Sequence, residues 1–147
     1  MKQVLFIVYG LMNKLELFAI LKINVDRFIF NTKFLLLMDL TKKKCVPCEA
    51  GMPPLEEAKV NELLKEIPAW SLKDWHLYKK FKFRNFKEAM KFVNSVADIA
   101  EQEGHHPDFC VHYNKVEVEL WTHAIKGLSE NDFILAAKID EINLLKQ

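Results

Sequence analysis

The chain has 147 residues, of which 50% are hydrophobic and 28% are charged, as expected for a single globular domain rather than a disordered segment. This length is enough to bury a core without disulfides or metal ions as supports. The formal net charge of +1 leaves no global positive field, which argues against a purely electrostatic nucleic-acid binder.

The first 37 residues are rich in Phe, Leu, Ile, Lys and Asn. Their longest run without a charged residue, Gln3 to Asn13, is shorter than the roughly 20 apolar residues of a membrane span, and no small-residue cleavage site follows it. Three interpretations stay open: an extension that packs on a partner, a membrane-associating or targeting segment, or sequence upstream of a true start at Met38. From Met38 onward the sequence is more polar and contains Gly and Pro residues at the expected turns. We therefore expect one domain over residues 38–147, with residues 1–37 as an extension of open status.

A loop over residues 39–54 precedes the first predicted helix. Pro54 suits the first helical position, and Glu56 and Glu57 in the first turn complement the helix dipole. Apolar residues then recur at roughly helical spacing until Pro68 ends the segment.

Two strands are predicted at residues 70–72 and 77–83, and alternation in the second puts Lys79 on its more apolar face. A long helix follows, with Asn85 as the candidate N-cap and Gly104 placed to end it in a left-handed conformation. Its apolar residues repeat every three or four positions and define the face that packs on the core. They are Phe86, Ala89, Met90, Phe92, Val93, Val96, Ala97, Ile99 and Ala100.

The period then changes to two, which predicts a hairpin of strands 109–113 and 116–122 around a polar turn at Asn114-Lys115. Ser129 opens a final helix in a capping-box-like sequence. The element order α-β-β-α-β-β-α predicts an α+β fold, a four-stranded antiparallel sheet with helices packed on one face. The chain has only four glycines and no glycine-rich phosphate loop, which excludes a dinucleotide-binding fingerprint.

Three of the five histidines, His105, His106 and His123, are predicted to meet. The pair lies at the exit of the long helix, and the hairpin runs out along one strand and back along a second of similar length, which returns His123 to the pair. Imidazole changes charge near neutral pH, so such a cluster suits general acid–base chemistry. Pro107 would fix the chain after the pair, and Asp108 could orient an imidazole.

Other interpretations compete with this one. His76 and His112 are better explained as surface or packed structural residues. Three histidines could also hold zinc with an open fourth position. Because the adjacent side chains of His105 and His106 point in different directions, however, double ligation by this pair is awkward.

The string Glu-Gln-Glu-Gly-His-His-Pro at residues 101–107, followed at set spacings by Tyr113, His123 and Asp132, resembles the signature of the pterin-4a-carbinolamine dehydratase family. The strings Gly-His-His-Pro-Asp-Phe, Tyr-Asn-Lys-Val and Gly-Leu-Ser-Glu-Asn-Asp-Phe resemble those of bacterial members. The resemblance covers roughly residues 38–147.

The resemblance implies a hydro-lyase that converts 4a-hydroxytetrahydropterin to quinonoid dihydropterin without a metal or organic cofactor. It also implies that His105, His106 and His123 are the catalytic and substrate-binding set. We expect His105 and His123 to transfer protons and His106 to bind and orient the pterin.

Asp108 and Asp132 match positions of the family signature and are assigned supporting roles, although Asp132 also suits a plain helix start. Trp121 either walls the pocket or packs in the core. The resemblance further implies a homodimer or homotetramer, linked in function to an aromatic amino acid hydroxylase. The net charge and the short apolar run predict no nucleic-acid or membrane partner, and the cysteine count favours the cytoplasm. The alternative is a non-catalytic dimerisation or regulatory partner protein of the same fold.

Cys45 and Cys48 form one Cys-x-x-Cys motif in the predicted loop. A zinc site needs two more ligands, and Cys110 lies in a predicted strand. A redox motif would open a helix directly after a strand, whereas this one follows lysines in a loop. Loop anchoring, metal binding and redox activity stay open, in that order of preference. The odd total of three cysteines argues against a secreted disulfide scaffold and favours a reducing compartment.

Overall fold

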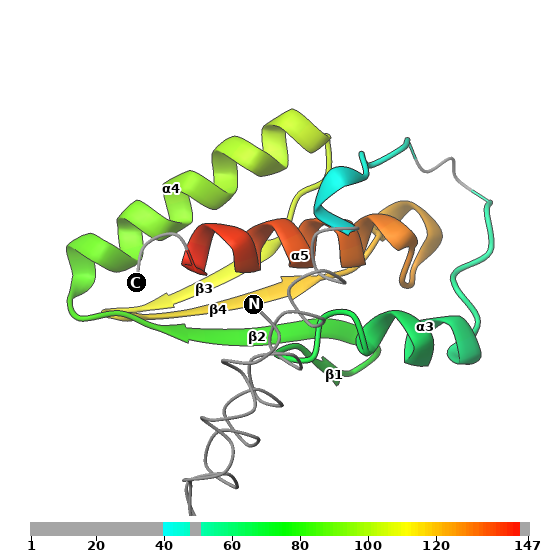
Figure 1. Cartoon of the computed structure of the whole chain (residues 1–147), viewed down its shortest axis with the longest axis horizontal. Coiled ribbons are helices and arrows are strands. Elements are labelled where there is room, and N and C mark those ends of the chain that lie inside the picture. Colours follow the sequence, from blue (N-terminus) through cyan, green and yellow to red (C-terminus); the bar gives the residue numbers. More distant parts are fainter. Residues whose placement is uncertain (1–39, 48–50, 145–147) are drawn as a thin grey trace, which may run out of the picture. The chain divides into compact units, whose positions relative to one another are not determined.

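The computed structural model describes residues 40–47 and 51–144, drawn as coloured ribbon in Figure 1. The expected order of helices and strands is confirmed, and a short 3-10 helix that the sequence patterns did not predict is added before the last helix. The segment at residues 1–37 lies outside the described residues. The elements are α3 (Glu57–Leu64), β1 (Ser71–Lys73), β2 (His76–Lys82), α4 (Phe86–Glu103), β3 (Asp108–His112), β4 (Lys115–Leu120), η1 (His123–Ile125) and α5 (Glu130–Leu144).

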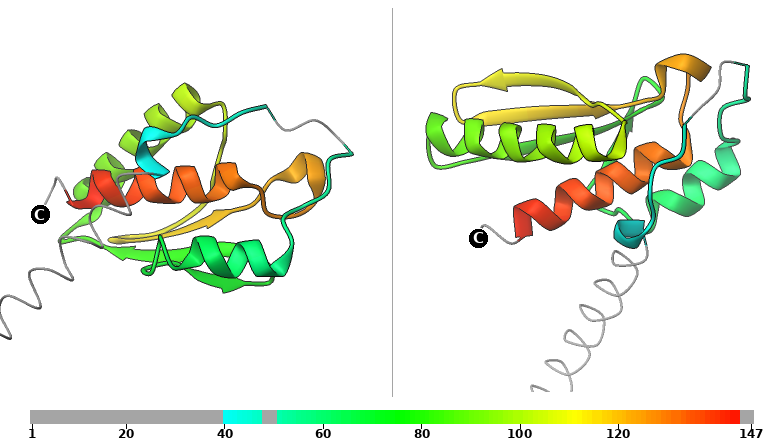
Figure 2. Two further views of the ribbon diagram at one scale, coloured as in Figure 1. Left: turned by 45° about the vertical axis from the view of Figure 1, so that its right-hand side comes forward. Right: turned by 90° about the horizontal axis from the view of Figure 1, so that it is seen from above.

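The four strands form one antiparallel sheet in the order β1-β2-β4-β3. Alternate residues of the two central strands are buried on one face, as period-two burial requires. Helices α4 and α5 lie together over this face, as expected from the sequence (Figure 1; Figure 2). The opposite face carries charged side chains, including the pair Lys80 and Glu117. The buried residues of the central strands are Leu77, Phe81, Val116, Val118 and Leu120.

Lys79 lies on the buried side of β2, as its place in the alternation predicts. Its Nζ is 2.5 Å from Oδ1 of Asp140 on α5, and its ammonium lies 4.9 Å from the ring centre of Phe81. Burial raises the pKa of the Asp140 carboxyl, and the nearby Lys79 charge opposes this rise. The apolar layer therefore contains one ion pair that joins the sheet to α5.

Both predicted caps of α4 are confirmed. The Asn85 side chain accepts the N–H of Glu88 at 3.0 Å, and Gly104 has φ 64° and ψ 27°. The buried stripe is narrower than predicted, because Ala97 is exposed and Phe86 is 49% exposed. Its fully buried members are Ala89, Phe92, Val96 and Ala100.

The four strands and α3 all have boundaries that differ from the predicted ones, and the structure explains two of these differences. Helix α3 begins at Glu57 rather than Pro54, because the N–H of Leu55 is donated to the Leu128 carbonyl at 2.8 Å and the chain stays extended through Glu56. The turn of the β3–β4 hairpin lies at residues 113–114, one position earlier than expected. Asn114 is fixed there because its Nδ2 donates to the Phe83 carbonyl at 2.7 Å.

Within residues 40–47 and 51–144, no helix combines the length and apolarity needed to cross a membrane.

Candidate active site

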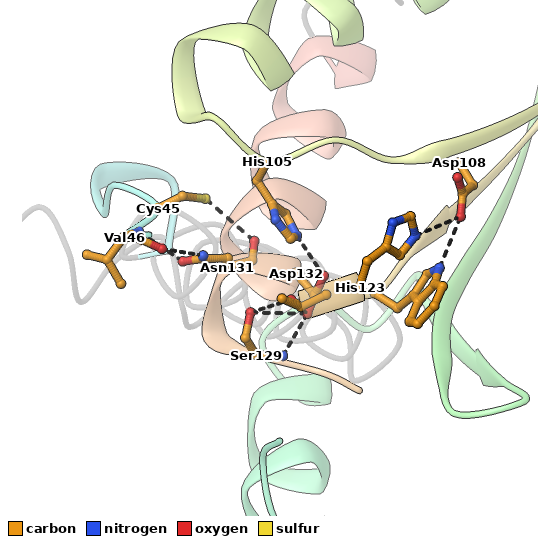
Figure 3. Close-up of polar contacts among 10 residues, drawn as sticks. Cys45, Val46, His105, Asp108, His123, Ser129, Asn131 and Asp132 are labelled. Atoms are coloured by element: carbon orange, nitrogen blue, oxygen red, sulfur yellow. Dashed lines mark hydrogen bonds and ion pairs between the residues drawn. The ribbon is translucent and has the colours of Figure 1, made fainter. Parts of the chain in front are cut away.

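A pocket of about 420 Å³ lies where α4 and β4 end and α5 begins. The three histidines that the hairpin argument places together, His105, His106 and His123, all line it. Asp108 and Trp121 also line the pocket, and Trp121 is in addition one of the partly buried residues that pack against the core, so its two interpretations do not exclude each other. Figure 3 shows the polar contacts on the two sides of this site.

The cap of α4 sets the position of His105. The left-handed Gly104 reverses the chain, and the N–H of His105 is then donated to the Ala100 carbonyl at 3.1 Å. The His105 side chain is turned inward and its Nε2 lies 2.7 Å from Oδ1 of Asp132 (Figure 3). Because a carboxylate only accepts hydrogen bonds, Nε2 carries the proton in this contact and Nδ1 is left as the basic nitrogen.

Asp132 lies behind His105 rather than in the pocket wall, and its side chain is fully buried. Its Oδ2 accepts from Thr122 Oγ1 at 2.9 Å and from the N–H of Ser129 at 2.7 Å. The Ser129 contact is half of a capping box, with the acidic residue at the third helical position. Asp132 is therefore a helix-start residue that also contacts His105, so the two interpretations considered from sequence do not exclude each other.

The other side of the pocket is open. His123 begins η1, its side chain is 62% exposed, and its Nε2 lies 3.6 Å from Oδ2 of Asp108. The same carboxylate oxygen accepts the indole N–H of Trp121 at 3.0 Å. The Trp121 ring contacts the His123 ring at a centroid distance of 4.1 Å and stacks on His76 at 4.6 Å and 8°.

Backbone hydrogen bonds close the loop that carries His123. The N–H of Thr122 is donated to the Gly127 carbonyl at 2.9 Å, and the N–H of Gly127 returns to the Thr122 carbonyl at 3.4 Å. Gly127 packs against Pro54 so closely that a Cβ at position 127 would lie 2.6 Å from the Pro54 Cβ. The residues just before α3 therefore support the loop of His123.

His106 is exposed, and its Nε2 lies 2.9 Å from Oε1 of Glu101 in the last turn of α4. Sequence reasoning did not identify Glu101 as a partner, although its place five residues before His106, in the last helical turn, is a signal for it. Neither His76 nor His112 lines the pocket. His76 supports Trp121 from behind and pairs with Glu119, while His112 contacts Cys110 Sγ on the exposed face.

Residues 45–47 form a further wall of the pocket that sequence reasoning missed. The N–H of Cys45 is donated to Oε2 of Glu103 at 2.9 Å, and its thiol contacts the Asn131 carbonyl at 3.7 Å. Burial, with a smaller contribution from the Glu103 charge, raises the pKa of the Cys45 thiol to about 12. These contacts are those of a loop anchor.

Cys48, the second cysteine of the motif, lies outside the described residues. Within residues 40–47 and 51–144, no group of three or more His, Cys, Asp and Glu side chains is arranged to hold a metal ion.

Comparisons with known proteins identify the family of this chain. The profile of the family described as pterin 4 alpha carbinolamine dehydratase matches residues 53–142. A protein of Rickettsia canadensis (strain McKiel), provisionally named pterin-4-alpha-carbinolamine dehydratase, is 53% identical over 103 residues, which cover 69% of this chain and 94% of the relative. A protein of the same provisional name from Rubrobacter xylanophilus is 45% identical over 105 residues, covering 71% and 98%.

A solved structure gives the same result. The crystal structure described as a transcriptional coactivator/pterin dehydratase from Brucella melitensis superposes with a TM-score of 0.58 at 35% identity. The match covers 60% of this chain and 97% of that one. The chain therefore belongs to the pterin-4a-carbinolamine dehydratase family of hydro-lyases.

Proposed function

We propose that this chain dehydrates 4a-hydroxytetrahydropterin to quinonoid dihydropterin by histidine general acid–base catalysis. The observation that carries the proposal is the meeting of His105, His106 and His123 around one pocket, two of them beside a carboxylate partner on α5 or β3. The pocket volume of about 420 Å³ is in the range of small-molecule sites and suits a two-ring heterocycle.

The reaction needs one acid and one base. The C4a–O bond breaks as the hydroxyl leaves as water, which requires a proton on that oxygen. The proton on N5 is lost, and its bonding electrons form the C4a=N5 double bond. One proton is given and one is taken, so the enzyme returns to its starting charge once the two imidazoles exchange protons with solvent.

We assign the two proton transfers to His105 and His123, and the binding and orientation of the pterin to His106. Asp132 positions His105 by holding its Nε2, which leaves Nδ1 as the nitrogen that exchanges a proton. Asp108 lies 3.6 Å from Nε2 of His123, and we assign it the role of orienting this imidazole. Trp121 offers a flat apolar wall beside His123 for a planar ring. We propose no metal or organic cofactor, because this loss of water involves no change of oxidation state and needs only the two proton transfers that accompany cleavage of the C4a–O bond.

The proposed substrate is the product of pterin-dependent aromatic amino acid hydroxylases. We therefore propose a functional link to such a hydroxylase, in which this chain recycles the hydroxylase's pterin cofactor in the cytoplasm. We also propose that it acts as a homodimer or homotetramer.

The test is a stopped-flow assay on 4a-carbinolamine generated enzymatically. If His105 and His123 transfer protons, His105→Ala and His123→Ala each lower kcat by about 10²–10⁴-fold. His112→Ala is the matched control, because His112 lies on the exposed face of the sheet and away from the pocket. Full activity in both pocket variants would contradict the mechanism.

Absence of any rate enhancement by the unmodified chain would instead favour the role of a non-catalytic dimerisation or regulatory partner.

A further inference from the structure

One histidine outside the pocket contacts the pocket wall. His76, the first residue of β2, does not line the pocket, yet its ring stacks on the ring of Trp121, which does line it. We propose that His76 is a positioning residue, which holds the Trp121 ring and through that ring sets the position of the His123 imidazole. This inference rests on the proposed function, in which His123 transfers a proton.

The register of the sheet brings the rings of His76 and Trp121 together. Leu77 on β2 faces Leu120 on β4, so His76 and Trp121 are the next facing positions of the same antiparallel pair. Because Leu77 and Leu120 are buried beneath the helices, their neighbours lie on the opposite face of the sheet. The two ring centres are 4.6 Å apart and the ring planes differ by 8°, which is the geometry of a stacked pair.

Glu119 fixes the orientation of the His76 ring. Its Oε1 lies 2.6 Å from Nδ1 of His76, and because a carboxylate only accepts hydrogen bonds, Nδ1 carries the proton in this contact. The side chains of His76 and Glu119 are only 25% and 30% exposed. The imidazole is therefore held at its edge by Glu119 while its flat face lies against the indole of Trp121.

The Trp121 ring in turn contacts both His123 and Asp108. Its centre lies 4.1 Å from the centre of the His123 ring, with the two planes at 58°. Its indole N–H is donated to Oδ2 of Asp108 at 3.0 Å, and the same oxygen lies 3.6 Å from Nε2 of His123 (Figure 3). A rotation of the indole would therefore disturb its contacts with both residues at once.

The His123 side chain depends on such support because its carboxylate holds it loosely. It is 62% exposed, and its distance to Asp108 is longer than an ordinary hydrogen bond. His105, by contrast, lies 2.7 Å from a fully buried carboxylate, that of Asp132. Since a misplacement of about 1 Å can lower a rate by as much as about 10²-fold, the packing of Trp121 against His123 is expected to affect the reaction.

The first test measures the position of the His123 ring without any turnover. An aromatic ring shifts the NMR resonances of nearby protons through its ring current, and the Trp121 ring lies close enough to act on His123 in this way. We expect His76→Ala to move the His123 ring-proton resonances, which are assigned by their loss in His123→Ala. His112→Ala is the matched control and should leave them in place, because His112 is an exposed histidine on the same sheet, away from the pocket.

Two further substitutions at His76 separate the stacked ring from the bulk of the side chain. His76→Phe keeps a flat ring against Trp121, whereas His76→Leu keeps an apolar side chain without a ring. We expect His76→Leu to move the His123 resonances and His76→Phe to move them less. Equal movements in these two variants would overturn the inference. His76→Leu also keeps the inference testable if His76→Ala does not fold.

The second test asks whether His76 acts on the reaction through Trp121. In the stopped-flow assay we expect His76→Ala to lower kcat/KM by about fivefold and His76→Phe to lower it by less than about twofold. In a Trp121→Ala background, His76→Ala should lower kcat/KM by less than about a further twofold, because the ring through which it acts is gone. Losses that multiply as if independent would overturn the inference.

The two tests separate this inference from the proposed function. If the unmodified chain does not dehydrate 4a-carbinolamine, the proposed function fails, while the His123 resonances still decide whether His76 positions that ring. If the chain is active and the His123 resonances stay in place in both His76→Ala and His76→Leu, only this inference is overturned. Resonances that move with no change in kcat/KM would also overturn it, because the contact would then have no effect on the reaction.

Discussion

The two histidine–carboxylate pairs at the pocket differ in construction. His105 and Asp132 are 2.7 Å apart, with side chains 10% and 0% exposed. His123 and Asp108 are 3.6 Å apart, beyond ordinary hydrogen-bond distance, with side chains 62% and 59% exposed. The first pair is held between two helix ends, whereas the second lies on a hairpin strand and a 3-10 helix.

This difference shows how one site can be both rigid and accessible. The geometry of the closed pair is set before substrate arrives, because Thr122 and Ser129 fix Asp132 from behind. The open pair is loose enough for a ligand to enter and for water to leave. A substitution should therefore act on both folding and catalysis at the closed pair, and mainly on catalysis at the open pair.

The largest effect is expected at the closed pair. Asp132→Asn places an amide opposite His105 Nε2 and favours the wrong imidazole tautomer, so kcat should fall by about 10³-fold. The donors on Ser129 and Thr122 lose a charged acceptor, so the free energy of unfolding should fall by about 2–3 kcal/mol. Stopped-flow kinetics and urea denaturation measure the two quantities. A kcat within threefold of the unmodified value would contradict the role of the closed pair.

The next effect concerns the thiols. Burial, and then the Glu103 charge, raises the pKa of Cys45 to about 12, whereas Cys110 is exposed. At pH 8 we expect iodoacetamide to label Cys45 at least about 100-fold more slowly than Cys110, because the thiolate is the reacting form. Peptide mass spectrometry gives both rates, and labelling in guanidinium chloride should remove the difference. Equal labelling rates in the folded protein would contradict the burial of the Cys45 thiol.

The contacts that hold Cys45 to Glu103 predict that the free energy of unfolding depends on pH. Burial by itself raises the pKa of Glu103, but the hydrogen bonds from Lys138 and the Cys45 N–H outweigh it and hold the pKa below its usual value of about 4.5. A lowered folded-state pKa stabilises the protein fully above pH 4.5, and this stabilisation is lost as pH falls through the folded value. At pH 7, Glu103→Gln should lower the free energy of unfolding by about 2 kcal/mol.

The difference in free energy of unfolding between the unmodified chain and Glu103→Gln should become smaller as pH falls below about 4.5. Denaturant melts across pH 3–8 test this, with Glu141→Gln as the control, because Glu141 is an exposed glutamate on α5. If this difference in free energy of unfolding stayed constant from pH 3 to pH 8, the stabilisation could not come from the charge on Glu103.

The smallest effect is expected at the open pair. Asp108→Asn keeps an oxygen that can accept from Trp121 but removes the charge near His123, so kcat should fall by about tenfold. Because both side chains are mostly exposed, the free energy of unfolding should change by less than about 0.5 kcal/mol. The ratio of the Asp132 and Asp108 effects is the direct measure of how much the two pairs differ, and equal losses of stability would contradict it.

Much of this architecture could be predicted because it depends on neighbours in sequence. The caps of α4 at Asn85 and Gly104 follow from local rules, and the hairpin return that brings His123 to His105 follows from strand lengths. The turn was misplaced by one residue because the long-range contact from Asn114 to Phe83 selects it.

The position of residues 45–47 at the pocket could not be predicted for the same physical reason. Val46 and Asn131 are 85 residues apart, and a pair of hydrogen bonds between such distant segments leaves no periodic trace in either of them. The pairing of Lys79 with Asp140 was hidden in the same way, although the alternation in β2 placed the lysine on the correct face.

The contact between Gly127 and Pro54 has a consequence for the catalytic loop. Residue 127 is bonded through its backbone to Thr122, the residue before His123, and it has no room for even one methyl group. An alanine there would have to push the loop away from the proline ring, and the imidazole would move with it. The position of the His123 imidazole, to which we assign a proton transfer, therefore depends on the absence of a side chain at residue 127, four residues further along the chain.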